Sequence, residues 1–106
     1  MPFISSQKVE IADTLKIRLY DFAMSLIHAC RDRDALACLL VSKTPLKEDC
    51  EFWICACRFN IARSTKDTQD IKSAIDIAQQ IVSGKIKVPQ RYIEGAGQML
   101  RKLQNQ

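Results

Sequence analysis

Hydrophobic residues recur every three or four positions along most of the chain, a spacing typical of amphipathic helices. The pattern predicts about five helices, one of them short, over residues 7–31, 35–42, 45–63, 66–83 and 89–103. An apolar helix face must be buried against another element. We therefore expect a compact all-α bundle that forms a single domain over residues 1–106.

The first predicted helix has the clearest amphipathic pattern in the chain. Its polar side includes Arg18, Asp21 and His28. Its expected inner face consists of Ile11, Leu15, Leu19, Phe22, Leu26 and either Ala29 or Cys30. Residues 1–7 are expected to form an extended leader before this helix. Residues 84–88 are expected to form an extended connector, because no other segment could pair with them as a strand.

The third predicted helix is apolar on two opposite faces. One face holds Leu46, Cys50, Trp53, Ile54, Cys57 and Ile61, and the other holds Phe52, Cys55, Phe59 and Ala62. A helix that is apolar on two sides is usually enclosed by other elements. The sequence therefore predicts that this helix is the centre of the fold. The alternative is that Phe52, Cys55 and Phe59 form an apolar surface for a partner.

Several residues predict where helices begin and end. Thr44 and Pro45 have the side chains of a helix N-cap and first position. Gly84 is expected to end the fourth helix in a left-handed conformation. Gly95 and Gly97 each cost the last helix up to ~1 kcal/mol relative to alanine. Gly95 and Gly97 are therefore tolerable if they allow another helix to approach the last helix closely.

Composition restricts the compartment in which the protein works. No apolar run approaches the ~20 residues needed to cross a membrane, and the first ten residues do not resemble a signal peptide. The five cysteines are odd in number and mostly follow the apolar pattern, which is typical of reduced, buried thiols. We therefore expect a cytoplasmic protein without a membrane partner.

The sequence offers no convincing catalytic, cofactor or metal site. Cys55 and Cys57 form a C-x-C pair, but residues two apart on a helix point about 200° apart and cannot bind one ion. His28 is the sole histidine and falls on the polar side of its helix, where a solvated role is expected. We therefore predict that the protein is not an enzyme and needs no cofactor.

Positive charge is concentrated near the end of the chain. The net charge is +4, yet acidic and basic residues are equal in number over residues 1–76. Residues 77–106 contain one acidic residue, Glu94, and five basic ones: Lys85, Lys87, Arg91, Arg101 and Lys102. A basic segment of this kind can bind a phosphate backbone or an acidic protein, and it can also be only a solvated face.

Two hypotheses for function follow. The first is a small non-catalytic intracellular protein that acts through protein–protein contact, as an adaptor, an inhibitor or an immunity-type protein. Its partner would be another protein or a second copy of itself, bound at Phe52, Cys55 and Phe59. The alternative is a nucleic-acid-binding regulator that uses the basic segment over residues 85–102.

Overall fold

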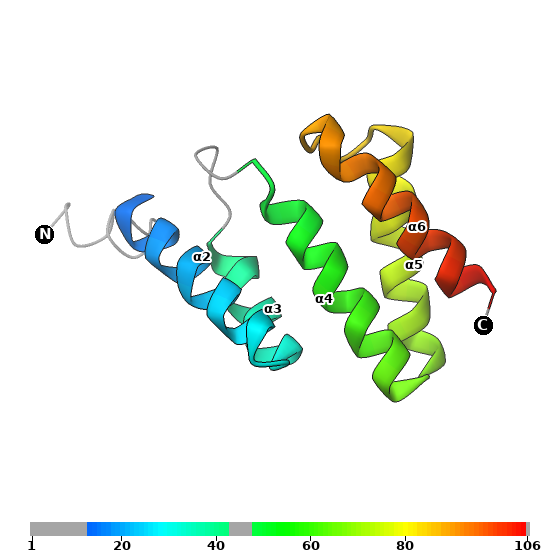
Figure 1. The fold of residues 1–106 in the computed structure, drawn as a ribbon, viewed down its shortest axis with the longest axis horizontal. Coiled ribbons are helices and arrows are strands. Elements are labelled where there is room, and N and C mark those ends of the chain that lie inside the picture. The colour runs from blue at the N-terminus through cyan, green and yellow to red at the C-terminus, as the bar shows by residue number, and fades with distance from the viewer. Residues whose placement is uncertain (1–12, 43–47, 106) are drawn as a thin grey trace, which may run out of the picture.

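The protein is an all-α bundle. The computed structural model describes residues 13–42 and 48–105, and that part of the chain contains five α-helices, one 3₁₀ helix and no strand (Figure 1). The predicted leader over residues 1–7 lies outside the described residues. The helices are α2 (Asp13–His28), α3 (Asp32–Val41), α4 (Cys50–Thr65), α5 (Thr68–Ser83), η1 (Gln90–Tyr92) and α6 (Ile93–Gln104).

The helices pack in chain order. α2 packs on α3, α3 on α4, α4 on α5 and α5 on α6, and α4 also contacts α6. As a result α2 and α6 lie at opposite ends of the array, with α4 between them (Figure 1). Short connections between consecutive helices favour this arrangement, because neighbouring elements in sequence then pack as neighbours in space.

The predicted central position of the two-faced helix is confirmed. Seven residues of α4 are buried, and they come from both of its apolar faces: Cys50, Ile54, Cys55, Cys57, Phe59, Ile61 and Ala62. Leu39 of α3 and Ile81 of α5 are fully buried on either side of α4. The helix therefore supplies the middle layer of the core, and α3, α5 and α6 cover it.

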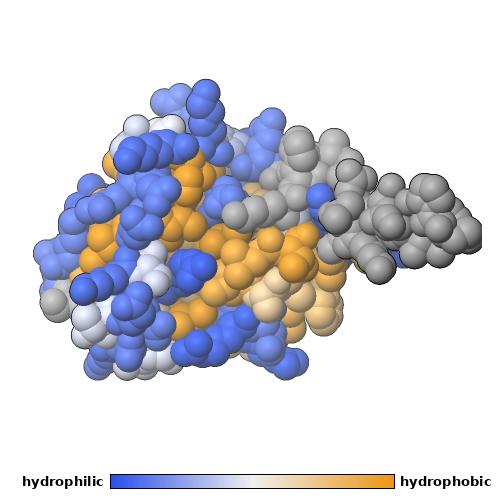
Figure 2. All heavy atoms as spheres, turned by 180° about the vertical axis from the view of Figure 1, so that it is seen from behind, coloured by the Kyte–Doolittle hydropathy of each residue, from blue (hydrophilic) through white to orange (hydrophobic). Residues whose placement is uncertain are grey.

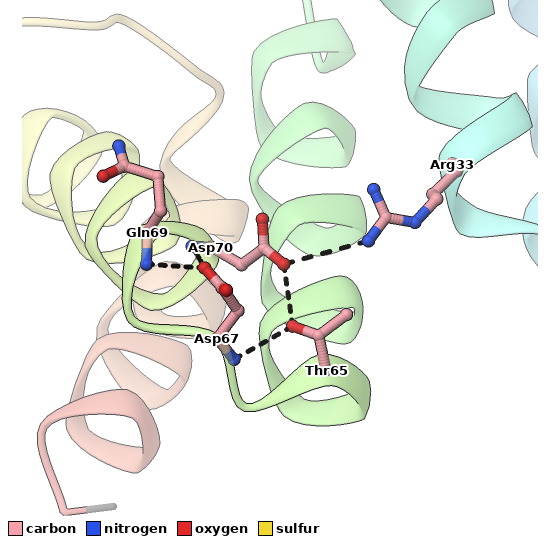
Figure 3. Close-up of polar contacts among 5 residues, drawn as sticks. All are labelled: Arg33, Thr65, Asp67, Gln69 and Asp70. Carbon is pink, nitrogen blue, oxygen red and sulfur yellow. Dashed lines mark hydrogen bonds and ion pairs between the residues drawn. The ribbon is translucent and has the colours of Figure 1, made fainter.

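The helix ends agree with most of the sequence signals. α5 begins as predicted, because Asp67 caps it by accepting hydrogen bonds from the backbone N–H groups of Gln69 (2.8 Å) and Asp70 (3.3 Å) (Figure 3). Gly84 ends α5 with a φ of 86°, which confirms its predicted left-handed conformation. The predicted extended connector after Gly84 contains no helix or strand before η1.

Several boundaries differ from the prediction. The last helix begins at Ile93 rather than Pro89, because a 3₁₀ helix over Gln90–Tyr92 precedes it. α2 ends at His28 rather than Arg31, and Cys30 adopts a left-handed φ of 60° in the turn that follows. α3 begins at Asp32, where acidic residues can stabilise a first helical turn. α4 begins at Cys50, after Asp49, so its start is about five residues later than expected. The proposed cap at Thr44 and Pro45 lies outside the described residues.

The inner face of α2 was predicted only in part. Leu26 is buried as predicted, together with Tyr20 and Ala23, whereas Leu15 and Phe22 are 49% and 57% exposed. Ile11 lies outside the described residues. The reason for the difference is that, in the part of the chain that the structure describes, α2 packs mainly against one neighbour, α3. One neighbour covers only part of the wide apolar arc that the sequence of α2 carries, and the rest remains in contact with solvent.

Candidate functional site

The apolar face formed by Phe52, Cys55 and Phe59 is covered by the chain itself. Cys55 is completely buried and Phe59 is 8% exposed, since Phe59 packs with residues of α5 and α6. Phe52 is half-buried. Its ring stacks on Tyr92 at 4.6 Å between centroids and contacts Trp53 edge-on at 5.1 Å. The prediction of an open partner surface at this face is therefore wrong for Cys55 and Phe59, because α5 and α6 occupy it.

A different apolar surface is exposed, on the hairpin of α2 and α3. The large hydrophobic side chains that are strongly exposed in the described residues are Leu15, Phe22, Leu40, Val41 and Val82. The first four belong to α2 and α3, and we call them the α2–α3 face. Leu15 and Phe22 are seven residues apart and so lie on the same side of α2. Seen from behind, hydrophobic side chains gather in an area that reaches this end of the molecule (Figure 2).

The sequence prediction missed this face. It assigned Leu15 and Phe22 to the inner face of the first helix, where both are exposed. The signal that could have found it is the width of the apolar arc of α2, which includes Tyr20 and Ile27 as well as Leu15 and Phe22. An arc of that width requires two packing partners, and within the described residues α3 supplies the main one.

At the N-terminal end of α4, one carboxylate oxygen of Asp49 accepts hydrogen bonds from side chains of three helices. Asp49 Oδ2 accepts hydrogen bonds from the hydroxyl of Tyr20 (2.7 Å), from Trp53 Nε1 (3.0 Å) and from the hydroxyl of Tyr92 (3.2 Å). Tyr20 belongs to α2, Trp53 to α4 and Tyr92 to η1. This Asp49 cluster ties both ends of the array to the start of α4, and no spacing in the sequence indicates it.

The environment of the Asp49 cluster shifts the pKa of its members. Partial burial raises the pKa of Asp49, but the hydrogen bonds from Tyr20, Trp53 and Tyr92 lower it by more, so the net pKa lies below the ordinary 3.8. Burial and the adjacent Asp49 carboxylate raise the pKa of Tyr20 well above 10.0. Asp49 therefore stays ionised and Tyr20 stays a donor at neutral pH, which suits a structural cluster better than proton transfer.

The cysteines are free thiols, and three of them are core residues. Cys50, Cys55 and Cys57 are buried, Cys38 is half-buried and Cys30 is exposed. Burial raises the pKa of Cys55 to about 11 and, together with the charge of Asp32, that of Cys57 to about 12. In the described residues, no group of three or more His, Cys, Asp or Glu side chains is arranged to hold a metal ion.

A polar cleft of about 290 Å³ lies between the α2–α3 turn and the end of α4. Its lining consists of residues 30–34, Asn60, Ile61, Ser64 and Thr65. Its charged side chains are engaged within the described chain. Arg31 pairs with Asp34 at 2.6 Å. Arg33 lies 3.8 Å from Asp70, whose carboxylate also accepts a hydrogen bond from Thr65 (Figure 3). The cleft therefore presents paired charges rather than an open ligand site.

The five basic residues near the C-terminal end are all exposed. We call Lys85, Lys87, Arg91, Arg101 and Lys102 the basic surface. None of them lies within 4.0 Å of a carboxylate in the described part of the chain. Arg91 lies over the ring of Tyr92, 4.8 Å from its centroid. They belong to the connector after α5, to η1 and to the last turn of α6, at the end of the array opposite α2 (Figure 1).

Comparison with known proteins found no matching family model, no similar curated protein and no similar solved structure. None of the helices in the described residues is long and apolar enough to cross a membrane.

Proposed function

We propose that the protein is a non-catalytic binding module that docks a helix of another protein on its α2–α3 face. The observation that carries this proposal is the concentration of exposed hydrophobic residues on one hairpin. Leu15, Phe22, Leu40 and Val41 are 45–57% exposed, and outside the hairpin only Val82 among the described residues is comparable. Large apolar side chains left exposed on one pair of helices are typical of interaction sites.

The packing order of the array favours a helix as the docked element. Among the described residues, each helix from α3 to α6 packs against at least two others, whereas α2 packs mainly against α3. A helix laid against α2 and α3 would extend the array by the same type of contact that builds the rest of it. An amphipathic helix in a groove between two helices is also a common mode of protein recognition.

The proposed location is the cytoplasm, and the proposed roles are those of an adaptor, an inhibitor or an immunity-type protein. Five cysteines without a disulfide support a reducing compartment. The paired charges of the polar cleft and the structural character of the Asp49 cluster support a role without catalysis.

Site-specific photocrosslinking tests this function. Phe22 is replaced by the photoreactive analogue p-benzoylphenylalanine in the cell that makes the protein, and Val82 is replaced in a matched control. We expect a discrete crosslinked polypeptide from position 22 and not from position 82. The identified polypeptide is then purified and its Kd measured. Phe22→Ser is expected to weaken binding about tenfold or more, as for a central aromatic contact.

The unfolding free energy of Phe22→Ser is measured as the accompanying control. Phe22 is 57% exposed, so its loss should leave stability nearly unchanged. Equal crosslinking at positions 22 and 82, or an unchanged Kd for Phe22→Ser, would overturn the proposal for this face.

A further inference from the structure

The basic surface has the form of a stripe rather than a cluster. Within α6, exposed positions recur at spacings of three and four at Glu94, Gln98, Arg101 and Asn105, and Lys102 lies next to Arg101. Because residues at this spacing lie on one side of a helix, Glu94, Gln98 and Arg101 share one side of α6. Arg91 is exposed on η1, directly before α6 begins. Lys85 and Lys87 extend the positive charge onto the connector that precedes η1.

The length of the stripe favours a polymeric ligand over a single small anion. About ten residues separate Arg91 from Arg101, and at a rise of 1.5 Å per residue they span about 15 Å. A single phosphate or carboxylate cannot reach both ends of such a stripe. A chain of regularly spaced anions can contact Arg91, Arg101 and Lys102 together.

The surroundings of the stripe offer little except charge. The apolar residues of the same segment, Ile86, Val88, Met99 and Leu100, are half-buried against the core, and Leu103 is buried. A protein partner usually needs an apolar anchor at the centre of its interface, and the stripe provides none. Tyr92 is half-buried between Phe52 and Arg91, so its ring is not free to stack on an unpaired base.

We infer that the basic surface binds the phosphate backbone of double-stranded nucleic acid without reading its sequence. Five exposed cations, none with a carboxylate within 4.0 Å in the part of the chain that the structure describes, supply the attraction, and Glu94 adds one repulsive charge. Glu48 shares a cleft of about 330 Å³ with Lys87 and weakens the field at the connector. Arg91, Arg101 and Lys102 are therefore expected to contribute most.

The dependence of binding on salt tests the inference. The probe is a mixed-sequence 20-base-pair DNA duplex, titrated with the purified full chain between 20 and 150 mM salt. Five phosphate contacts give a slope of log K against log salt of about −4.5 as the upper limit. The double variant Arg101→Gln/Lys102→Gln should reduce the slope by about 2. Glu94→Gln should strengthen binding about fivefold at low salt, because one repulsive charge is removed.

Arg18→Gln is the matched control, since Arg18 is exposed on α2 at the opposite end of the array. It removes one positive charge and should leave the slope unchanged. No binding at 20 mM salt would overturn the inference. An equal loss of slope in Arg18→Gln and in a single Arg101→Gln variant would also overturn it, because net charge alone would then explain binding. Tighter binding of a polyglutamate peptide of equal charge would assign the surface to an acidic protein instead.

Discussion

Asp49 forms hydrogen bonds with side chains of α2, α4 and η1. One oxygen of its carboxylate accepts three hydrogen bonds, from Tyr20, Trp53 and Tyr92. An amide at this position keeps one acceptor but loses the charge that strengthens each bond. Asp49→Asn is therefore expected to lower the free energy of unfolding by about 1–3 kcal/mol, measured by urea titration. Asp21→Asn, at an exposed position of α2, should change it by less than about 0.5 kcal/mol.

The stabilisation by Asp49 should depend on pH in a defined direction. The folded-state pKa of Asp49 is below the ordinary 3.8, so the folded protein binds this proton less readily than the unfolded chain does. The contribution is then fully present above 3.8 and is lost as the pH falls through the folded-state pKa. The stability difference between wild type and Asp49→Asn should therefore be constant near neutral pH and shrink below 3.8. A difference that grows on acidification would contradict the assigned pKa shift.

The cysteines should differ sharply in reactivity. Thiol alkylation requires an accessible thiolate. Cys30 is exposed, Cys38 is half-buried, and burial raises the pKa of Cys55 to about 11 and of Cys57 to about 12. Iodoacetamide at pH 8 should modify Cys30 first and Cys38 more slowly. Peptide mass spectrometry should find adducts on Cys50, Cys55 and Cys57 only after unfolding in urea. Fast alkylation of Cys55 in the folded protein would contradict the burial of this thiol in α4.

The two glycines of helix α6, Gly95 and Gly97, differ in the space available for a side chain. A Cβ at Gly95 would lie 3.2 Å from Phe52 Cε1, whereas one at Gly97 would lie 4.0 Å from its nearest neighbour, Val82 Cγ2. The Phe52 ring cannot yield easily, because Tyr92 stacks on it and Trp53 contacts it edge-on. The expected close approach is therefore present at Gly95 and absent at Gly97.

Alanine substitution should separate the two glycines. Gly97→Ala is expected to stabilise the protein by about 0.5–1 kcal/mol through helix propensity. Gly95→Ala gains the same propensity but overpacks Phe52 at a cost of about 1–3 kcal/mol, so it should be neutral or destabilising. Thermal unfolding of both variants measures the difference. Phe52→Leu combined with Gly95→Ala should recover part of the loss, and no recovery would exclude overpacking as the cause.

The elements themselves were largely predictable, because each helix repeats its apolar residues at helical spacing. The two-faced pattern placed α4 at the centre, and Gly84 marked the end of α5. The exposed faces were less predictable. An apolar stripe indicates that a helix can be covered and does not indicate by which neighbour. The burial of Phe59 was therefore left open, and Phe22 was placed inward although it is exposed. Both outcomes depend on the order in which helices pack, which residue spacing does not encode.

For the whole molecule, the packing order separates two different surfaces. The α2–α3 face is apolar and lies at one end of the array, and the basic surface is polar and lies at the other end (Figure 1). A ligand on one surface does not obstruct the other. The two proposals therefore combine into a bridging role, in which a protein partner bound at α2 and α3 is brought to an anionic polymer bound along α6.

The same packing order predicts a gradient of local stability along the array. α4 packs against α3, α5 and α6, whereas α2 packs mainly against α3 and is tied to α4 by the hydrogen bond from Tyr20 to Asp49. Segments with few buried contacts open at lower free energy than the global unfolding free energy. Amide hydrogen exchange followed by mass spectrometry should therefore be faster in peptides of α2 than in peptides of α4.

Tyr20→Phe should increase the difference in exchange rate between α2 and α4. The substitution removes the hydrogen bond from Tyr20 to Asp49 and keeps the ring that packs on the core. Exchange in α2 is expected to accelerate by about five- to tenfold, which corresponds to the loss of one hydrogen bond to a charged group. Exchange in α5 should change little, because α5 packs mainly on α4 and α6. Equal acceleration in α2 and α5 would mean that the bundle opens as one cooperative unit and that its α2 end has no separate mobility.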